Sequence, residues 1–253
     1  MAGTVPPEAR QALLAEPGPP SAFTEAELEG LPGPVRRYLA AAIAPGTPLA
    51  TAARLRMRGQ VRLGRWVPFR AEQLLAPHRG FHWAARAAGV IGGFDRYVGG
   101  RGQMRWRLLG LVPVMAADGP DLSRSAAGRV VGEAMWVPTA LLPRFGVDWS
   151  AADDHHLSAR WRVNTHQAEL ELVVDDLGRL REGAFQRWGD PDRTGSYGLH
   201  PCGDEVTAYA TFGGVSVPSA GRAGWFYGTD RWAEGEFFRY QLTSLELVTQ
   251  PGS

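Results

Sequence analysis

The sequence contains no lysine, one cysteine and no long apolar run, and each absence narrows what the protein can do. All 27 of its lysine-plus-arginine total are arginine. This excludes Schiff-base enzymes, P-loop proteins and kinases, because their chemistry needs a lysine side chain. The formal net charge of +1 shows no excess of basic residues, so we expect no nucleic-acid partner.

Cys202 is the single cysteine, so the chain cannot form an internal disulfide or a paired-cysteine metal site. This predicts a reduced, cytoplasmic setting. The N-terminal residues lack the basic start and apolar stretch of a secretory signal, and no run reaches the ~18 apolar residues of a membrane span. We therefore expect no transmembrane segment. Nothing in the sequence indicates the oligomeric state.

The chain is instead rich in glycine (32 residues) and proline (19), which favours frequent turns over long helices. Apolar and arginine side chains alternate over residues 54–63, as expected for a strand with one buried face. Similar stretches recur along the chain. They predict a mainly β (α+β) fold, in which about ten curved antiparallel strands form a half-barrel or barrel closed by two or three helices.

Two segments of this fold can be placed more closely. Residues 1–22 hold one weak helical stretch and a proline-rich linker, so we expect a flexible N-terminal arm followed by a single half-barrel domain at residues 23–250. A two-residue hairpin loop at Thr165-His166 would place Trp161 opposite Leu170, with Arg160 opposite Glu171 on the other face.

No complete catalytic, metal or cofactor motif is present. The run Asp153-Asp154-His155-His156 contains metal-ligating side chains, but adjacent residues of an extended chain point to opposite faces, which favours a polar loop. Dinucleotide fingerprints and nucleophile elbows do not occur. We therefore expect no metal and no cofactor.

Three polar residues are candidates for catalysis. Glu133 shares the apolar face of a predicted helix, where burial would raise its pKa and suit it to acid or base work. The alternative is an ion pair with Arg129, one helical turn earlier. Asp95 and Tyr97 lie on the same side of a glycine-bounded strand, where a structural hydrogen bond is the alternative role.

Bulky aromatic residues fall on the apolar phases of the predicted elements. Inside a curved sheet they either fill the core or line an apolar cavity. The candidate ligand-binding residues are Phe81, Trp83, Trp106, Trp136, Trp161, Trp225 and Tyr240.

Two motifs, LPGPVRRYL at residues 31–39 and EAMWVPTALLP at residues 133–143, resemble an uncharacterised bacterial family of unknown function. The resemblance runs from about residue 30 to residue 248. Members of that family are similar to the LolA-type lipoprotein carriers, half-barrels closed by helices over an apolar cavity. The resemblance implies a lipid or other apolar ligand, with Trp136 and its helix as a lid. Because the chain lacks an export signal, the transport role is not carried over.

These observations predict a soluble binding protein that holds an apolar small molecule or lipid-like ligand in a half-barrel cavity. The alternative is a cofactor-independent cyclase, isomerase or hydrolase that acts on a polyketide-like or terpenoid substrate there, with Glu133 as acid or base. A core without a cavity would instead favour a structural or interaction module.

Overall fold

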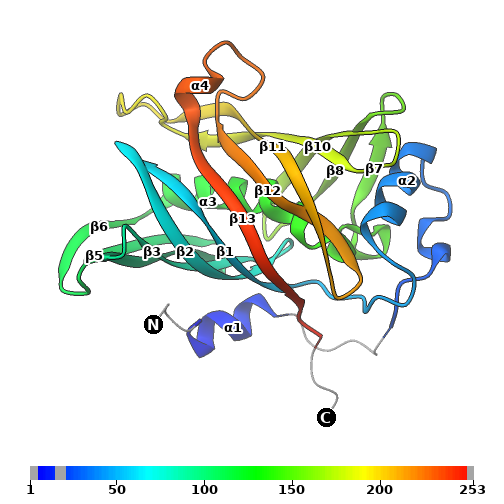
Figure 1. Ribbon diagram of the computed structural model, residues 1–253, viewed down its shortest axis with the longest axis horizontal. Coiled ribbons are helices and arrows are strands. Elements are labelled where there is room, and N and C mark those ends of the chain that lie inside the picture. Colours follow the sequence, from blue (N-terminus) through cyan, green and yellow to red (C-terminus); the bar gives the residue numbers. More distant parts are fainter. Residues whose placement is uncertain (1–4, 15–20, 250–253) are drawn as a thin grey trace.

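A computed structural model describes residues 5–14 and 21–249. In this part of the chain, thirteen strands form one antiparallel, strongly curved sheet (Figure 1). The strands are β1 Ala53–Leu63, β2 Arg65–Ala76, β3 Gly80–Ala87, β4 Ile91–Val98, β5 Arg101–Leu108, β6 Val112–Asp118, β7 Asp148–Ala151, β8 His156–Val163, β9 His166–Val174, β10 Leu180–Gly189, β11 Gly198–Phe212, β12 Val215–Trp225 and β13 Glu236–Leu247.

The strand order places the first and last strands side by side in the middle of the sheet. From one edge to the other, the order is β6-β5-β4-β3-β2-β1-β13-β12-β11-β10-β9-β8-β7. The β1–β13 pairing runs from Ala53 opposite Leu247 to Val61 opposite Phe238. It joins two wings, each of which follows the chain outward to an edge strand.

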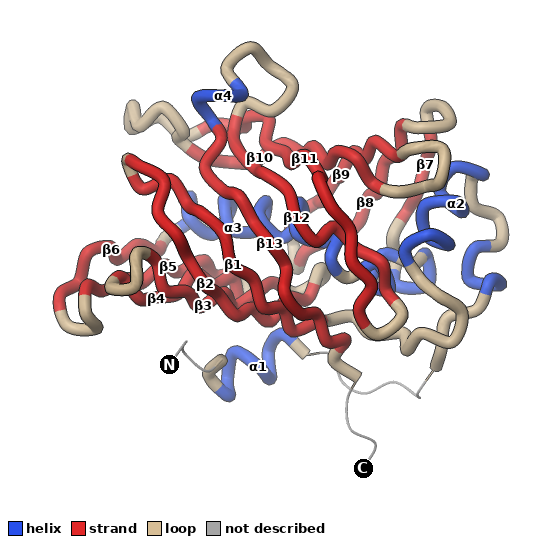
Figure 2. The backbone as a smooth tube through the Cα atoms, viewed as in Figure 1, coloured by secondary structure: helices blue, strands red, loops and turns tan. Residues whose placement is uncertain are grey.

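This topology explains the position of the longest helix, α3 (Pro120–Glu133). The segment that contains α3 connects β6 with β7, the two opposite edges of the sheet, so it has to cross one face. In Figures 1 and 2, α3 lies behind the strands at the middle of the sheet. It contacts both wings, because Ser123 Oγ accepts from Gly102 of β5 and the Ser125 carbonyl accepts from Arg187 of β10.

We call the face that carries α3 the inner face and the opposite one the outer face. Inner positions of β1 are largely buried while arginines occupy the exposed outer positions, as the sequence alternation predicts. Glycine allows the close approach of α3 to β10, since a Cβ at Gly132 would lie 2.4 Å from the Phe185 ring. The main core lies between the inner face and the segment from α3 to the following short turns.

The remaining helical elements are short and lie around the sheet. They are α1 Pro7–Leu13, α2 Gly33–Ala42, α4 Trp232–Gly235 and the 3-10 turns Glu25–Leu28, Ala134–Trp136, Pro138–Leu141 and Pro143–Phe145. None of the helices in the described residues has the length and apolar character of a membrane span. Within the expected arm, residues 1–4 and 15–20 lie outside the described residues. The described part forms α1, whose Leu13 packs with Leu74 on the outer face.

The mainly β class and the antiparallel curved sheet are confirmed, but the expected number of about ten strands is wrong. Three strands of the structure carry a weak sequence signal: β6 lacks alternation, β7 has four residues, and the apolar stretch over residues 206–217 gives no clear sign that it spans two strands, β11 and β12. The structure turns there at Gly213 and Gly214, whose positive φ angles of 55° and 93° suit glycine.

The predicted β8–β9 hairpin forms, but its loop lies one residue earlier than expected. Val163 pairs with His166, so the loop is Asn164-Thr165, and Trp161 faces Ala168 in place of Leu170. Asn164 has a φ of 53°, a left-handed conformation that asparagine adopts more readily than most residues. The charged pair on the exposed face is therefore Arg160 with Glu169, at 2.6 Å.

Candidate functional site

A chain of contacting aromatic rings crosses the inner face. Neighbouring ring centroids lie 5.7 Å apart for Trp106 and Trp83, 5.8 Å for Trp83 and Phe69, and 4.9 Å for Phe69 and Phe238. The chain continues over 6.2 Å to Tyr240 and 5.2 Å to Trp136. We call this set the aromatic row: Trp106, Trp83, Phe69, Phe238, Tyr240 and Trp136.

The row crosses the β1–β13 junction because Gly59 leaves room for it. Gly59 pairs with Phe69 on β2 and with Tyr240 on β13. A Cβ at Gly59 would lie 1.9 Å from the backbone oxygen of Arg239 and 3.0 Å from the Phe69 ring. The aromatic surface is therefore continuous from one wing to the next.

Two of the predicted carboxylates meet beside this row on a single arginine. Arg129 of α3 donates from Nε to Glu133 at 2.6 Å and from Nη1 to Asp95 at 3.2 Å. Trp106 Nε1 donates to the other oxygen of Asp95 at 2.8 Å. We call Asp95, Arg129 and Glu133 the ion triad. Their side chains are 14–16% exposed, so the triad is largely shielded from water.

The ion triad carries one more negative than positive charge when both acids are ionised. Burial raises the pKa of Asp95, and Glu133 adds to this increase, while Arg129 and the hydrogen bond from Trp106 oppose it. The guanidinium of Arg129 also lies 4.4 Å from the ring centroid of Phe81 and 4.9 Å from that of Trp83. Asp95 is thus the member of the triad that burial favours in its protonated form.

Two polar atoms next to the triad lack hydrogen-bond partners among the described residues. Gln73 donates from Nε2 to Glu133 at 2.5 Å, which leaves its buried Oε1 unpaired. Trp83 is directly opposite Gln73 in the sheet, and its buried Nε1 is unpaired as well. An unpaired buried donor or acceptor costs about 1–3 kcal/mol, so one donor and one acceptor are available to a bound group.

One end of the aromatic row is partly open to solvent. The inner-face side chains of Val61, Ile91, Trp106 and Phe238 are half-buried and pack against the core. Their partly exposed side chains extend the apolar surface of the aromatic row to the solvent-exposed edge of the inner face.

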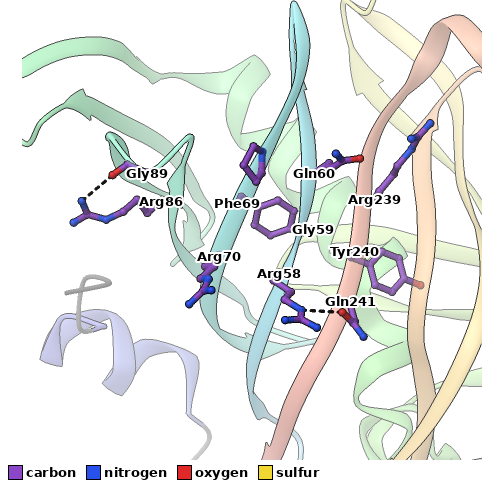
Figure 3. A pocket seen from close by; sticks show the side chains of 11 residues that line it. Arg58, Gly59, Gln60, Phe69, Arg70, Arg86, Gly89, Arg239, Tyr240 and Gln241 are labelled. Atoms are coloured by element: carbon purple, nitrogen blue, oxygen red, sulfur yellow. Dashed lines mark hydrogen bonds between the residues drawn. The ribbon is translucent and has the colours of Figure 1, made fainter.

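A hollow of about 560 Å³ lies elsewhere, mainly over the outer face of β1, β2 and β13 (Figure 3). Arg58, Arg70 and Arg86 line it and stand directly opposite one another on β1, β2 and β3. Within the described residues, Arg58 bonds to Gln241, Arg86 bonds to the Gly89 carbonyl, and none of the three arginines has an ion-pair partner. The hollow is cationic and differs from the apolar cavity that the sequence predicts.

Comparison with known proteins places this architecture in a family. The profile described as "Family of unknown function (DUF6544)" matches residues 21–237. The chain belongs to the DUF6544 family. Among curated proteins, none matches it.

Solved structures resemble this DUF6544 chain only distantly. The LolA superfamily protein NE2245 from Nitrosomonas europaea has 11% identity over 86% of this chain and 93% of that chain, with a TM-score of 0.46. An outer membrane lipoprotein-sorting protein domain from Vibrio parahaemolyticus has 8% identity over 80% and 87%, with a TM-score of 0.41. A DUF1329 family protein from Desulfovibrio piger has 9% identity over 80% and 88%, with a TM-score of 0.42. These likenesses are too distant to transfer a ligand or a role.

The structure gathers most of the aromatic candidates of the DUF6544 chain but separates two of them. Phe81, Trp83, Trp106, Trp136 and Tyr240 lie in the aromatic row or beside the triad. Trp161 is buried in the other wing and donates to the Pro77 carbonyl at 3.0 Å. Trp225 of β12 packs against His200 and Phe237, and the guanidinium of Arg187 lies 4.9 Å from its ring centroid. Neither tryptophan belongs to the aromatic row.

Two further candidates, Tyr97 and Trp136, are buried in the core. Tyr97 shares the inner side of β4 with Asp95, as expected, but it is fully buried and its ring lies 6.2 Å from that of His166. Trp136 is 2% exposed and donates to the Pro218 carbonyl at 3.0 Å. It packs within the core under Tyr240. The lid role that the resemblance implies for Trp136 stays a prediction.

The Asp153–His156 run forms a polar loop. Asp153 accepts from the backbone amides of His155 and His156, and it also contacts His156 Nδ1 at 2.8 Å. The ring of His155 turns away to the Val174 carbonyl. No group of three or more potential metal ligands occurs in the part of the chain that the structure describes.

Sequence reasoning missed Gln73 and Asp204 of the inner face, and it predicted only one of the two carboxylates that Arg129 contacts. Gln73 occupies a position of an alternating strand where the pattern calls for an apolar residue, and this could have identified it as a buried polar group. Arg129 was considered only as a partner for Glu133, and the structure adds Asp95. Asp204 lies under Tyr240, whose hydroxyl donates to it at 3.4 Å. Burial raises the pKa of Asp204 to about 7.

Proposed function

We propose that the protein binds an apolar small molecule or lipid-like ligand against the aromatic row. The unpaired Trp83 Nε1 and Gln73 Oε1, which belong to directly opposite residues of β3 and β2 beside the aromatic rings, carry this proposal. A bound hydroxyl accepts from the indole and donates to the amide oxygen. The apolar remainder of such a ligand covers half-buried rings such as Phe238 and Trp106, which releases water from apolar surface.

The charge of the ion triad narrows the chemical class of the ligand. Asp95 and Glu133 share Arg129, and the partly buried Arg187 of β10 adds a second positive charge that acts on both carboxylates. The charges of these four groups balance, so the site gains nothing from a charged ligand. A neutral hydroxyl satisfies both unpaired atoms without adding charge. The proposed ligand is therefore an apolar alcohol, such as a long-chain or polycyclic one.

The ligand is tested by native mass spectrometry and solvent extraction of the protein purified without detergent. The expected result is a co-purifying neutral molecule that Trp83→Phe loses, since this change keeps a ring and removes the donor. Trp161→Phe is the matched control and retains the molecule, because Trp161 is buried in the other wing. An empty protein that also fails to bind decanol would contradict the proposal.

A second candidate function is acid–base catalysis on such a ligand. Two carboxylates share one guanidinium, and the pKa of Asp95 is raised by burial. A buried carboxyl whose pKa is raised, next to a second carboxyl, suits proton transfer in a cofactor-independent isomerase, cyclase or hydrolase.

Glu133→Gln separates the binding function from the enzyme function. The amide keeps the shape of the side chain but cannot take up a proton, so an enzyme would lose turnover at least about a hundredfold. Binding of decanol, measured by calorimetry, is expected to persist. A large drop in melting temperature for the variant, with no defined activity found for the wild type, would mark Glu133 as a structural residue.

We also propose the cytoplasm as the location of the protein. The support is that the single Cys202 cannot form an internal disulfide, the bond that stabilises many proteins of oxidising compartments. Cell fractionation with an antibody tests this, and recovery in a periplasmic or extracellular fraction would contradict it.

A further inference from the structure

The hairpin between β5 and β6 ends in an exposed apolar segment that the proposed function does not use. Its tip comprises residues 108–115, and no charged residue occurs between positions 108 and 117. Leu109 is 69% exposed and Leu111 is 78% exposed; Val112, Val114 and Met115 are exposed too. Contiguous exposed apolar surface of this kind marks a contact with another molecule or with a membrane.

A bulge in β6 places its apolar side chains mainly on one side of the hairpin. Val112 and Met115 pair with inner-face residues of β5, whereas Pro113 pairs with Arg107 on the outer face. Leu109 and Leu111 lie in the turn itself and are the most exposed residues of the tip. An apolar turn with an arginine beside it suits insertion at the boundary of a lipid layer.

At the tip, Leu109 adopts a backbone conformation that is unfavourable for leucine. Leu109 has a φ of 52°, in the left-handed region that glycine or asparagine occupies more easily. Its amide donates to the Val90 carbonyl at 2.8 Å, which ties the tip to the β3–β4 turn. Val90 is also exposed, so the second turn extends the apolar surface.

Arginines surround this apolar surface on the outer face. Arg107 immediately precedes the tip, and Gly92 lies between Arg107 and Arg86 in the sheet register. From Arg86 the row continues through Arg70 to Arg58, the arginines of the outer hollow (Figure 3). Among the described residues, none of these four arginines has a carboxylate partner. Like charges directly opposite one another destabilise a sheet, and a layer of anionic groups relieves that repulsion.

We propose that the protein docks on the surface of an anionic lipid bilayer through this hairpin. The tip enters the boundary between headgroups and acyl chains, and Arg107 and Arg86 contact the lipid phosphates. Guanidinium groups bind phosphate through paired hydrogen bonds, so arginine suits this position. The docking surface is independent of the ligand proposed for the inner face.

A second copy of the chain is the competing occupant, through edge-to-edge pairing of β6. Pro113 argues against it, because proline removes a backbone donor from the free edge of a strand. The arginine row also repels an identical row. A copy-to-copy contact is therefore an outcome that the experiment has to distinguish.

The experiment is sedimentation of the full chain with vesicles. One set contains phosphatidylcholine alone, and the other contains equal parts of phosphatidylcholine and phosphatidylglycerol. The wild-type protein is expected to bind the anionic vesicles at least about tenfold more tightly than the neutral ones. The double variant Leu109→Asp/Leu111→Asp is expected to lose this binding.

Leu177→Asp/Leu199→Asp is the matched control, because both leucines are exposed but lie far from the hairpin in sequence. It is expected to bind like the wild type. Arg86→Gln/Arg107→Gln is expected to weaken binding and flatten its dependence on salt. Unchanged circular dichroism establishes that each variant folds. Absence of binding by the wild type, equal loss in the control, or a dimer in sedimentation equilibrium that the hairpin variant abolishes would overturn the proposal.

Discussion

Several residues on the inner face are deeply buried and yet have a polar atom without a hydrogen-bond partner. Gln73 and Trp83 each leave one polar atom unpaired, and Asp204 leaves its Oδ1 unpaired as well. Such groups lower stability unless a ligand or a proton satisfies them. Their concentration beside the aromatic row is the residue-level reason to place a binding site there.

Asp204 makes the stability of the protein depend on pH. Its pKa is raised from 3.8 to about 7, mainly by burial, so the folded state holds a proton that the unfolded state releases. The free energy of unfolding from this group falls as pH rises from about 4 to about 7, and stays low above that range. At about 1.4 kcal/mol per pKa unit, the loss is at most about 4 kcal/mol.

Asp204→Asn is expected to remove this contribution. Urea unfolding of the variant and the wild type, at about pH 5 and about pH 8, measures the change. The stability advantage of the variant should grow with pH, because asparagine never ionises. The same difference between the two proteins at both pH values would contradict the assignment.

The sequence predicts individual residues of the site better than their contacts. Asp95 and Glu133 were identifiable because a carboxylate at an apolar position of a strand or helix is conspicuous. Arg129 was identifiable as a partner of Glu133, but its contact with Asp95 was not, because that contact depends on where α3 crosses the sheet. That crossing follows from the edge-to-edge connection of β6 with β7, which no local pattern reveals.

At the scale of secondary structure, the β8–β9 hairpin shows how far alternation alone can reach. The pattern of apolar and charged residues predicts the two strands and their faces. A shift of the loop by one residue preserves those faces while changing every partner, and the choice falls to Asn164, which adopts a positive φ. Turn chemistry therefore decides the register, and it is the weaker signal in the sequence.

The β1–β13 junction depends on a glycine at a single position. Gly59→Ala is expected to lower the free energy of unfolding by about 2–4 kcal/mol, because its Cβ would overlap the backbone oxygen of Arg239, which cannot move without breaking the strand pairing. Thermal and urea unfolding measure this loss.

Gly92→Ala is the matched control for that prediction. Gly92 also lies within a strand, but nothing is within 4 Å of the position of its Cβ. Its change should leave stability within about 1 kcal/mol of the wild type. Equal effects of the two changes would show that the close approach at Gly59 does not determine stability.

The whole molecule is a single sheet whose terminal strands meet in the middle and whose two edges are joined across the inner face by the segment containing α3. This arrangement brings Arg129 and Glu133 of α3 against Asp95 of β4 and Gln73 of β2. It also projects the β5–β6 hairpin away from the core at one end (Figure 1). The hairpin adjoins the open end of the aromatic row, because Met115 pairs with Trp106.

The indole N–H of Trp83 provides the most direct measurement of the central claim, that a hydroxyl-bearing apolar ligand binds against the aromatic row. In ¹H–¹⁵N spectra, the signal that Trp83→Phe removes is followed during titration with decanol. We expect that signal to move downfield and saturate as the indole gains an acceptor, while the already bonded indole of Trp161 stays unchanged. A Trp83 signal that does not move, or moves no more than that of Trp161, would contradict the account.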